Sequence, residues 1–321
     1  KIYVIKINNQ YKIKLKVKLK GKIKEELLMK LENQYLLVEV SEDGAEITKI
    51  YNKEDGTDII WEGNPEFWKR HSPVLFPNVG KTYKNKMLIN GEEYTTSQHG
   101  FARDSVFECV ESTDSMVSFL LNSSEETKKK YPFDFKLFVN YYLEGKEVKV
   151  EWKVENTGNE TMYFTIGAHP AFRFAKKDEV KSDYILKFPG KDQLEYILVD
   201  KETEDGMGTA IPEEKRTLKL ENNTYVLNEE IFDNDALILD GTQIEEAWVC
   251  HKDGTPYVGM KCEGFPSFGI WSVKDAPFVC LEPWMGRCDD RGFNKEISQK
   301  NNINKVEPGK EFLKAYTIIV A

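Results

Sequence analysis

The sequence predicts an all-β protein, a large antiparallel β-sandwich, and three observations carry this prediction. Short apolar runs separated by turn residues succeed one another from residue 35 to the end of the chain. Several runs alternate apolar and charged residues with a period of two, which is typical of a strand with one solvated face. Helical signals are few, since only residues 291–300 suggest one short turn.

The first predicted strands belong to two hairpins. The run YLLVEV (35–40) is followed by a Glu-Asp-Gly turn and then by AEITKI (45–50). The stretch NKEDGTDIIW (52–61) holds another Asp-Gly pair between apolar flanks. Asp-Gly between apolar runs is a strong short-range hairpin signal.

The middle of the chain predicts a long strand pair. FDFKLFVNYYL (133–143) and VKVEWKVEN (148–156) flank the turn EGKE. In the second strand Val148, Val150, Trp152 and Val154 alternate with Lys149, Glu151, Lys153 and Glu155. We therefore expect one face of this strand to be buried and the other to contact water.

The last third contains strands that are apolar throughout. SFGIWSV (267–273) and FVCLEPW (278–284) predict strands buried on both faces. EPGKEF (307–312) predicts a turn, and LKAYTIIVA (313–321) predicts the final strand. No internal repeat and no Pro- or Ser-rich linker divides the sequence, so we expect one domain over residues 29–321.

The amino-terminal segment differs in composition. Residues 1–30 hold ten Lys and two Glu, a charge of +8, whereas the whole chain carries −9. KIKLKVKLKGKIKEELL (12–28) is low in complexity, and Met29 begins an ordinary sequence. We expect residues 1–28 to be an upstream extension or a misassigned start, outside the fold. A basic arm could bind nucleic acid, but the acidic body opposes this because phosphate backbones need a basic face.

Composition also limits the class of protein. Apolar residues make up 40% and aromatic residues 12% of the 321, enough for a sizeable core. No apolar run approaches the roughly 18 residues that a membrane helix needs, and the start lacks the apolar region of a signal peptide. Five scattered cysteines without a CxxC pair oppose a disulfide framework or a zinc ribbon. We expect a cytoplasmic protein with neither nucleic-acid nor membrane partners.

Four polar residues stand where an apolar strand meets a turn. They are Arg70 in FWKRHSPVLFPNVGK, His99 in SQHGFARD, His169 in GAHPAF and Glu282 in FVCLEPWMGR. Buried charge is costly unless it is paired, so such placements often serve function. Taken singly, each also has a structural explanation, as a hydrogen-bonded histidine, half of an ion pair or a charge at a rim.

Three of these motifs together carry a family resemblance. QHGFARD, GAHPAF and LEPWMG follow one another with His99, His169 and Glu282 about 70 and 113 residues apart. In this combination residues 29–321 resemble the aldose 1-epimerase (galactose mutarotase-like) family, and within it the LacX-like branch. The resemblance implies a large β-sandwich whose concave face holds a sugar, and reversible interconversion of α and β anomers.

The resemblance also implies roles for the site residues. Ring opening needs one base and one acid across the C1–O5 edge, with pKa values pushed apart by their surroundings. By the match, Glu282 takes the proton of the C1 hydroxyl and His169 gives one to the ring oxygen. His99 hydrogen-bonds the sugar and supports the developing charge, and Arg70 binds nearby hydroxyl groups.

Further binding residues are assigned more loosely. In IFDNDALIL (231–239) the match points to Asp235 as an acid that binds substrate, with Asp233 and Asp240 as close competitors. Trp284 and Phe172 either offer apolar faces to the sugar ring or pack in the core.

Three residues fall outside these assignments. Trp271 is expected in the core. His71 departs from the small or polar residue expected after Arg70, and His251, in the turn-like CHKDGTP, is expected to be a solvated loop residue.

Rival functions stay open. Two histidines and a carboxylate could form a metal-binding facial triad, but no HxH or HxxxH pair occurs, and we predict no metal. No nucleotide-binding glycine fingerprint appears, so we predict no cofactor. A glycosidase would need two carboxylates about 5 to 10 Å apart, and the sequence pins only one. A non-catalytic carbohydrate-binding protein on the same fold is a further alternative.

The substrate is predicted to be a neutral aldohexose, with a hexose 6-phosphate as the alternative. A phosphate site would want several basic groups at the rim of the pocket, and the candidates are Arg70, Lys81, Arg103 and Arg287. The small-molecule sugar is the expected partner, bound by a monomer or a homodimer.

Overall fold

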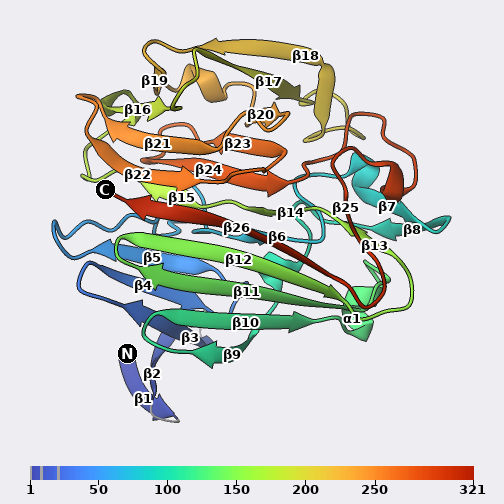
Figure 1. Ribbon diagram of the computed structural model, residues 1–321, viewed down its shortest axis with the longest axis horizontal. Coiled ribbons are helices and arrows are strands. Elements are labelled where there is room, and N and C mark those ends of the chain that lie inside the picture. The colour runs from blue at the N-terminus through green and yellow to red at the C-terminus, as the bar shows by residue number, and fades with distance from the viewer. Residues whose placement is uncertain (1, 8–9, 20–21) are drawn as a thin grey trace.

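The computed structural model describes the backbone of residues 2–7, 10–19 and 22–321, and the side chains from residue 28 onward. Its regular structure is almost all β-strand (Figure 1). The helical elements are α1 (Glu125–Lys128) and the 3-10 turns η1 (Tyr83–Asn85), η2 (Ala102–Asp104), η3 (Lys181–Asp183), η4 (Glu230–Phe232) and η5 (Ile297–Gln299). The last of these confirms the short turn predicted within residues 291–300.

The larger sheet has nine strands, paired antiparallel throughout. In spatial order they are β19 (Thr224–Val226), β16 (Tyr184–Lys187), β21 (Glu246–His251), β22 (Pro256–Lys261), β26 (Glu311–Val320), β12 (Glu147–Asn156), β11 (Phe135–Glu144), β10 (Met116–Asn122) and β9 (Glu108–Ser112).

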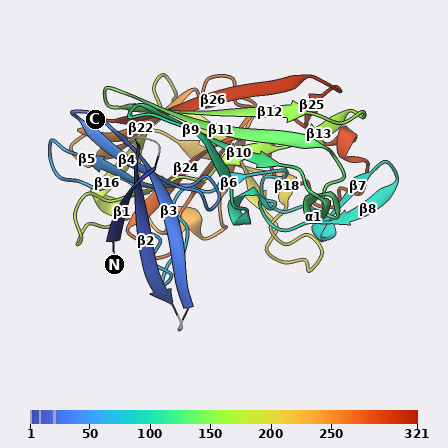
Figure 2. The ribbon, with the colours of Figure 1, turned by 90° about the horizontal axis from the view of Figure 1, so that it is seen from below.

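The second sheet has eight strands. In spatial order they are β18 (Ala210–Lys219), β17 (Gln193–Val199), β20 (Leu237–Asp240), β23 (Ser267–Trp271), β24 (Phe278–Met285), β14 (Ile166–Ala168) and β6 (Val74–Leu75), with β15 (Ala171–Arg173) also paired to β24. In Figure 2 strands β11, β12 and β26 lie at the top, and β6, β18 and β24 lie beneath them. The predicted antiparallel β-sandwich is therefore confirmed.

Smaller sheets complete the fold. One has five strands in sequence order, and β13 (Met162–Phe164) with β25 (Asn304–Val306) and β7 (Lys86–Ile89) with β8 (Glu92–Thr95) form two-stranded sheets. The five are β1 (Ile2–Ile7), β2 (Gln10–Leu19), β3 (Lys22–Glu32), β4 (Leu36–Ser41) and β5 (Ile47–Asn52).

The hairpin predictions are confirmed with one difference. Strands β4 and β5 pair as the first hairpin, and β11 and β12 join through a two-residue loop after the pair Glu144 and Glu147. On β12 the four predicted inward residues are fully buried. The stretch 52–61 does turn, but its far side contributes isolated bridges, from Asp58 to Tyr51 and from Ile60 to Phe172, and no second strand.

Strand β24 shows why a strand buried on both faces can carry a site. Its odd-numbered residues Val279 and Leu281 belong to the main hydrophobic core. Successive side chains of a strand point to opposite faces. Cys280, Glu282 and Trp284 therefore lie on the other face of the eight-stranded sheet, away from the main core.

The expected boundary at residue 29 falls inside β3. The residues on either side of it, Leu28 and Met29, are 4% and 2% exposed, and Leu28 pairs with Ser41 of β4. The side chains of residues 1–27, on which the expectation of an extension rests, lie outside the described residues. Figure 2 shows β2 and β3 reaching away from the body.

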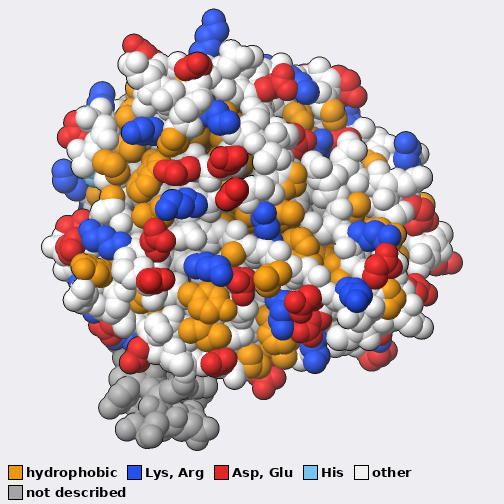
Figure 3. Space-filling view, in the orientation of Figure 1, with side chains coloured by type: hydrophobic (Ala, Val, Ile, Leu, Met, Phe, Trp, Pro, Cys, Tyr) orange, Lys and Arg blue, Asp and Glu red, His pale blue; other side chains and the backbone are white. Residues whose placement is uncertain are grey.

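The surface mixes charges of both signs, as Figure 3 shows for one face. On β12 the outward residues form the pairs Lys149–Glu151 and Lys153–Glu155. None of the helices in the described part of the chain is both long and apolar enough to cross a membrane.

Candidate active site

A cavity of about 480 Å³ opens beside strands β20, β23 and β24, on the face of the eight-stranded sheet that carries Glu282. Loops from both halves of the chain complete its wall. The lining residues are Trp68, Val79, Gly80, Gln98, His99, Arg103, His169, Val199, Lys201, Gly208, Phe232, Asp235, Ala236, Ile238, Trp271, Ser272, Val273, Glu282, Trp284 and Cys288. It brings together His99, His169 and Glu282 from the three sequence motifs.

Strand register places His169 opposite Glu282. Gly167 of β14 pairs with Trp284, and Ala171 of β15 pairs with Cys280, both on β24. The same register puts His169, between β14 and β15, across from Glu282. The ladder is interrupted there because Pro170 follows His169 and Pro283 follows Glu282, and proline has no N–H to donate. The break leaves two polar side chains facing each other at the cavity wall.

The two groups are close and buried. Nδ1 of His169 lies 3.4 Å from Oε1 of Glu282, and the residues are 6% and 1% exposed. Trp68 stacks on the imidazole at 4.7 Å between ring centroids, and Trp271 meets it edge-on at 5.4 Å. These aromatic rings hold the imidazole in one orientation and exclude water from one side of it.

Burial shifts the pKa values of His169 and Glu282 in the directions that favour the neutral form of each group. It lowers the pKa of His169 to about 3, and the Arg103 and Arg70 guanidinium groups act in the same direction. It raises the pKa of Glu282 well above its usual range, helped by the Asp235 carboxylate. In the free protein the proton therefore belongs on Glu282. An imidazolium facing a carboxylate holds the same number of protons, so a single proton transfer relates the two forms.

His99 is fixed by the backbone of Gly80. The His99 N–H donates to the Gly80 carbonyl at 2.8 Å, and the Gly80 N–H donates to Nδ1 of His99 at 3.0 Å. Because Nδ1 accepts, the ring proton is on Nε2. His99 has φ of 66°, in the left-handed region, which is costly for a residue with a side chain. Burial lowers its pKa well below the usual value, so the imidazole is neutral.

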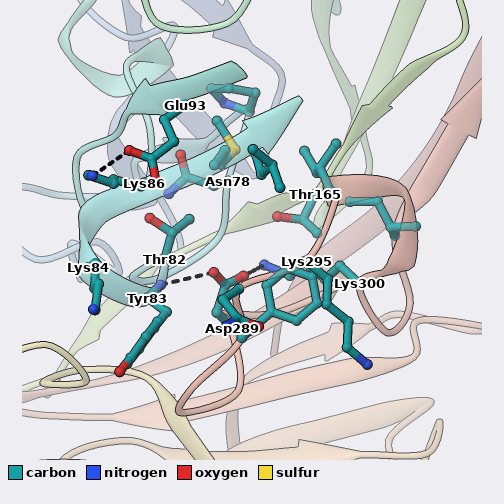
Figure 4. Close-up of a pocket in the computed structure, with 17 residues that line it drawn as sticks. Asn78, Thr82, Tyr83, Lys84, Lys86, Glu93, Thr165, Asp289, Lys295 and Lys300 are labelled. Atoms are coloured by element: carbon teal, nitrogen blue, oxygen red, sulfur yellow. Dashed lines mark hydrogen bonds and ion pairs between the residues drawn. The ribbon is translucent and has the colours of Figure 1, made fainter. Parts of the chain in front are cut away.

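A second cavity, of about 90 Å³, lies beside the segment that holds Gly80, and neither His169 nor Glu282 lines it. Pro77, Asn78 and Thr82 line the second cavity, whereas Val79 and Gly80 line the first. Figure 4 shows Asp289 between two donors in this cavity: the Tyr83 N–H at 2.9 Å and Nζ of Lys300 at 2.7 Å.

Asp289 also bonds to the segment that lines the first cavity. Its own N–H donates to the Lys81 carbonyl at 2.9 Å. The Asn78 side chain donates to the Gly80 carbonyl at 3.0 Å. These bonds hold the segment from which Gly80 orients His99.

Two glycines make room for Trp284 under the cavity. A Cβ on Gly167 would lie 2.5 Å from the indole, and one on Gly269 of β23 would lie 2.3 Å from it. Such distances are far below van der Waals contact, so the ring lies across the bare backbones of the strands on either side of β24. This explains the glycine that precedes the motif histidine in GAHPAF.

Of the three candidate carboxylates, Asp235 lines the cavity. It is exposed, and its φ of 71° is again in the left-handed region. Asp240 accepts from Ser267 and from Nε of Arg287, each at 2.6 Å. Asp233 is exposed, and its carbonyl accepts from Lys201 at 2.6 Å.

The guanidinium group in the cavity lining belongs to Arg103. Arg70 lies behind it, donating to the Arg103 carbonyl at 3.2 Å and to Asp104 at 2.7 Å. Phe172 lies in the core, paired with Val279 across β15 and β24.

The other basic candidates for a phosphate site are arranged differently. Arg287 is buried and neutralised by Asp240 and Asp290. Lys81 donates to Asn85 at 3.1 Å.

The remaining histidines have structural partners. Nδ1 of His71 lies 2.8 Å from the Trp61 carbonyl, and the His71 N–H donates to Glu46. His251 ends β21, half-buried, with its ring 5.2 Å from that of Tyr184. The expectation of a solvated loop residue is therefore wrong for His251, because its ring packs on an aromatic neighbour.

A buried lysine joins two loops of the cavity rim. Nζ of Lys181, 2% exposed, donates to the carbonyls of Val273 at 2.8 Å and Ala276 at 3.1 Å and lies 3.0 Å from Oε1 of Glu229. Val273 lines the cavity, and Glu229 precedes the turn that leads to Asp235. Lys181 thus holds the two sides of the rim together.

Sequence reasoning did not assign Trp68, Lys181 or Lys201 to the site, and it left Trp271 in the core. Trp271 in fact contacts both the cavity and a small hydrophobic cluster. Trp68 stands two residues before Arg70 in FWKRHSPVLFPNVGK. Its closeness to a candidate site residue in the sequence was the signal that could have assigned it to the site. Lys181 stands in an ordinary polar stretch, which gives no signal before the fold is known.

Comparison with known proteins identifies the family. The family model for aldose 1-epimerase matches residues 28–290. The chain belongs to the aldose 1-epimerase family. It is accordingly an isomerase of the mutarotase type, and its substrate is a small-molecule sugar.

Individual relatives agree with the family. The plasmid-encoded Protein LacX of Lactococcus lactis is 30% identical over 304 residues, covering 92% of this chain and 99% of the relative. The galactose mutarotase related enzyme from Lactobacillus acidophilus is 30% identical, with a TM-score of 0.84 over 92% of this chain and 97% of that structure. A galactose mutarotase-like protein from Lactobacillus casei is 28% identical, with a TM-score of 0.82 over 92% and 100%. The predicted LacX-like branch is therefore confirmed.

Proposed function

We propose that this aldose 1-epimerase interconverts the α and β anomers of a neutral aldohexose, with Glu282 as the base and His169 as the acid. The observation that carries the proposal is the buried pair, 3.4 Å apart, in the wall of a cavity large enough for a hexose. Reaction requires one proton to leave the C1 hydroxyl and one to reach the ring oxygen. A facing acid and base supply both transfers.

Glu282 and His169 can exchange all the protons that ring opening and closure require. Glu282, as carboxylate, takes the C1 hydroxyl proton while His169, as imidazolium, protonates the ring oxygen, and the C1–O5 bond breaks. The pair is then neutral, the form that burial favours. The open aldehyde rotates about C1–C2, and both transfers reverse as the ring closes on the other face. The enzyme returns to its starting protonation state, so the cycle needs neither a metal nor a cofactor.

His99 and three further lining residues complete the proposal. The Nε2–H of neutral His99 donates to the sugar and supports negative charge that develops on it. Asp235 accepts from hydroxyl groups, and Trp284 offers an apolar face. In this proposal Arg103 binds hydroxyls where the sequence suggested Arg70, because Arg103 lines the cavity and Arg70 is bound to Asp104.

The cellular compartment and the oligomeric state are part of the proposal as well. Cys250, Cys262, Cys280 and Cys288 are buried thiols outside any disulfide, which supports a reducing compartment such as the cytoplasm. We retain the monomer or homodimer as the working form.

Polarimetry tests the proposed reaction. Fresh α-glucose and α-galactose are followed with protein that has been dialysed against a chelator. We expect the rate of mutarotation to rise above the spontaneous rate in proportion to the amount of protein, and to survive the dialysis. Sugar binding without acceleration would support the non-catalytic alternative instead. Activity lost on dialysis and restored by a metal would favour the facial-triad reading.

A further inference from the structure

A cysteine shares the face of β24 that carries the base. Cys280 and Glu282 are two residues apart, so their side chains point the same way, and His169 faces Glu282 from the neighbouring strands. One ligand atom from each of His169, Cys280 and Glu282 lies within 4.8 Å of the other two. Imidazole, thiolate and carboxylate are the three ligand types of protein zinc sites.

Two buried atoms of the cluster have no hydrogen-bond partner. Nδ1 of His169 and Oε2 of Glu282 are buried without a hydrogen bond. A buried polar atom left without a partner destabilises the folded state. A cation bound between the three groups would provide the missing interactions.

The geometry suits a small cation that prefers nitrogen and sulfur. Bond lengths of about 2.0–2.3 Å in a tetrahedral zinc site put neighbouring ligand atoms about 3.5 Å apart. The His169–Glu282 distance of 3.4 Å already matches, and the ligand atoms of the whole cluster lie within 4.8 Å of one another, so a bound cation would draw the three groups together. Three protein ligands leave a fourth position for water from the cavity, as in open zinc sites.

We propose that this cluster is an inhibitory site for Zn²⁺ and similar thiophilic divalent cations. The Cys280 thiol and the Glu282 carboxyl group each release a proton to solvent as the metal binds, so that a thiolate, a carboxylate and the neutral imidazole of His169 hold the cation. Bound metal occupies the base and the acid together, so neither can exchange a proton with a sugar. That inhibition rests on the proposed function, whereas metal binding itself does not. Mg²⁺ and Ca²⁺, which prefer oxygen ligands, should not bind.

Cys280 distinguishes this site from the catalytic pair. It is fully buried beside Trp61 and Phe278 in a small cluster, where a thiol could serve as ordinary packing. If packing were its only role, a serine would change stability but not the response to zinc. Cys262 offers a matched control, since it is another fully buried thiol in the main core, away from the cavity.

The experiment uses the full chain after chelator treatment. Binding of Zn²⁺ is measured by competition with a chromophoric chelator, and Co²⁺ reports sulfur ligation through its thiolate charge-transfer band. Mutarotation is measured on the same samples with and without Zn²⁺ or Mg²⁺. We compare the unaltered protein with Cys280→Ser and Cys262→Ser, and with Cys280→Ala if the serine variant does not fold.

We expect one Zn²⁺ per chain, a cobalt–thiolate band and lost mutarotation in the unaltered protein and in Cys262→Ser. Cys280→Ser should bind Zn²⁺ at least 10- to 100-fold more weakly, since even outer-shell changes cost that much, and should lack the band. Equal affinity in both variants, no binding, or activation by Zn²⁺ would overturn the proposal. Absence of mutarotation from every metal-free sample would contradict the proposed function, while the binding data would still decide the metal site.

Discussion

At the residue scale, the acid–base pair makes the sharpest prediction. His169→Asn and Glu282→Gln should each lower turnover about 10²- to 10⁴-fold, the usual contribution of a positioned general acid or base. The double variant should lose little more than either single one, because the two groups act as one unit. Polarimetry in both anomeric directions should show equal losses, since a catalyst leaves the equilibrium unchanged.

His251→Asn is the matched control for these variants. His251 is half-buried beside the Tyr184 ring and does not line the cavity. Its replacement should leave turnover within about twofold of the unaltered enzyme, on the premise that it has no part in proton transfer. The melting temperature is measured on each preparation. A stable and fully active His169→Asn enzyme would refute the catalytic role of His169.

At the element scale, Lys181 is predicted to position the cavity rim. Lys181→Met removes the donor to Val273, Ala276 and Glu229 and leaves the buried Ala276 carbonyl without that partner. A buried acceptor left unpaired costs about 1–3 kcal/mol. Both rim loops should loosen, so KM should rise about 10-fold or more while kcat falls less, because the acid–base pair is untouched. Enzyme kinetics and thermal melting measure the two effects.

Lys187→Met on the exposed face of β16 serves as the comparison for that variant. It should change neither KM nor the melting temperature appreciably. If Lys181→Met lowered stability but left KM unchanged, the lysine would support the fold without positioning the rim.

The glycine that makes room for Trp284 gives a second prediction at this scale. Gly269→Ala would bring a methyl group to 2.3 Å from the indole, which must then move toward the cavity or force β23 away. We expect weaker sugar binding and a loss of about 1–3 kcal/mol of stability from overpacking. Intrinsic fluorescence and sugar titration report both.

Gly158→Ala is the matched control, because a methyl group there would find its nearest neighbour at 3.4 Å. It should leave fluorescence and sugar binding unchanged. If Gly269→Ala also left sugar affinity unchanged, Trp284 would have no part in binding.

The sequence predicts individual strands better than it predicts which residues of different strands come into contact. Period-two alternation on β12 was sufficient to predict its buried face, because the side on which each residue lies depends only on its position within the strand. The opposition of His169 and Glu282 depends on a register between strands 113 residues apart, which no local pattern encodes. The same limit applies to Arg70 and Arg103, which stand in two of the polar stretches of the sequence: only the folded loops decide which guanidinium group reaches the cavity.

At the scale of the whole molecule, the amino-terminal segment is predicted to be dispensable. A chain beginning at Met29 keeps Met29 and Leu31 of β3, both buried, and it also keeps every residue of the cavity. Loss of Leu28 should cost no more than the roughly 1.5–3 kcal/mol of one buried leucine. Mutarotation and thermal melting of the shortened chain test this.

A chain beginning at Gln34 supplies the contrast. It removes all of β3, including the fully buried Leu31, and exposes the edge of β4, so it should unfold at a clearly lower temperature. If the chain from Met29 were equally damaged, the Lys-rich segment would be part of the fold.

Charge distribution decides the predicted preference for unphosphorylated sugars. The whole chain carries −9, so its field disfavours a dianionic phosphate. Of the four basic candidates, Arg70, Arg103 and Arg287 are all paired with carboxylates, and Arg103 alone lines the cavity. Lys201, which also lines it, donates to the Asp233 carbonyl. A phosphate would want several converging donors that are free to reorganise.

We therefore expect kcat/KM for glucose or galactose to exceed that for the 6-phosphates by about 10-fold or more at low salt. The gap should narrow as salt is raised, because ions screen the repulsion between the acidic molecule and the phosphate. Arg103→Gln should lower kcat/KM for both classes of sugar if the guanidinium binds hydroxyl groups. A preference for the phosphates that Arg103→Gln abolishes would instead make Arg103 the core of a phosphate site and assign the enzyme to phosphorylated hexoses.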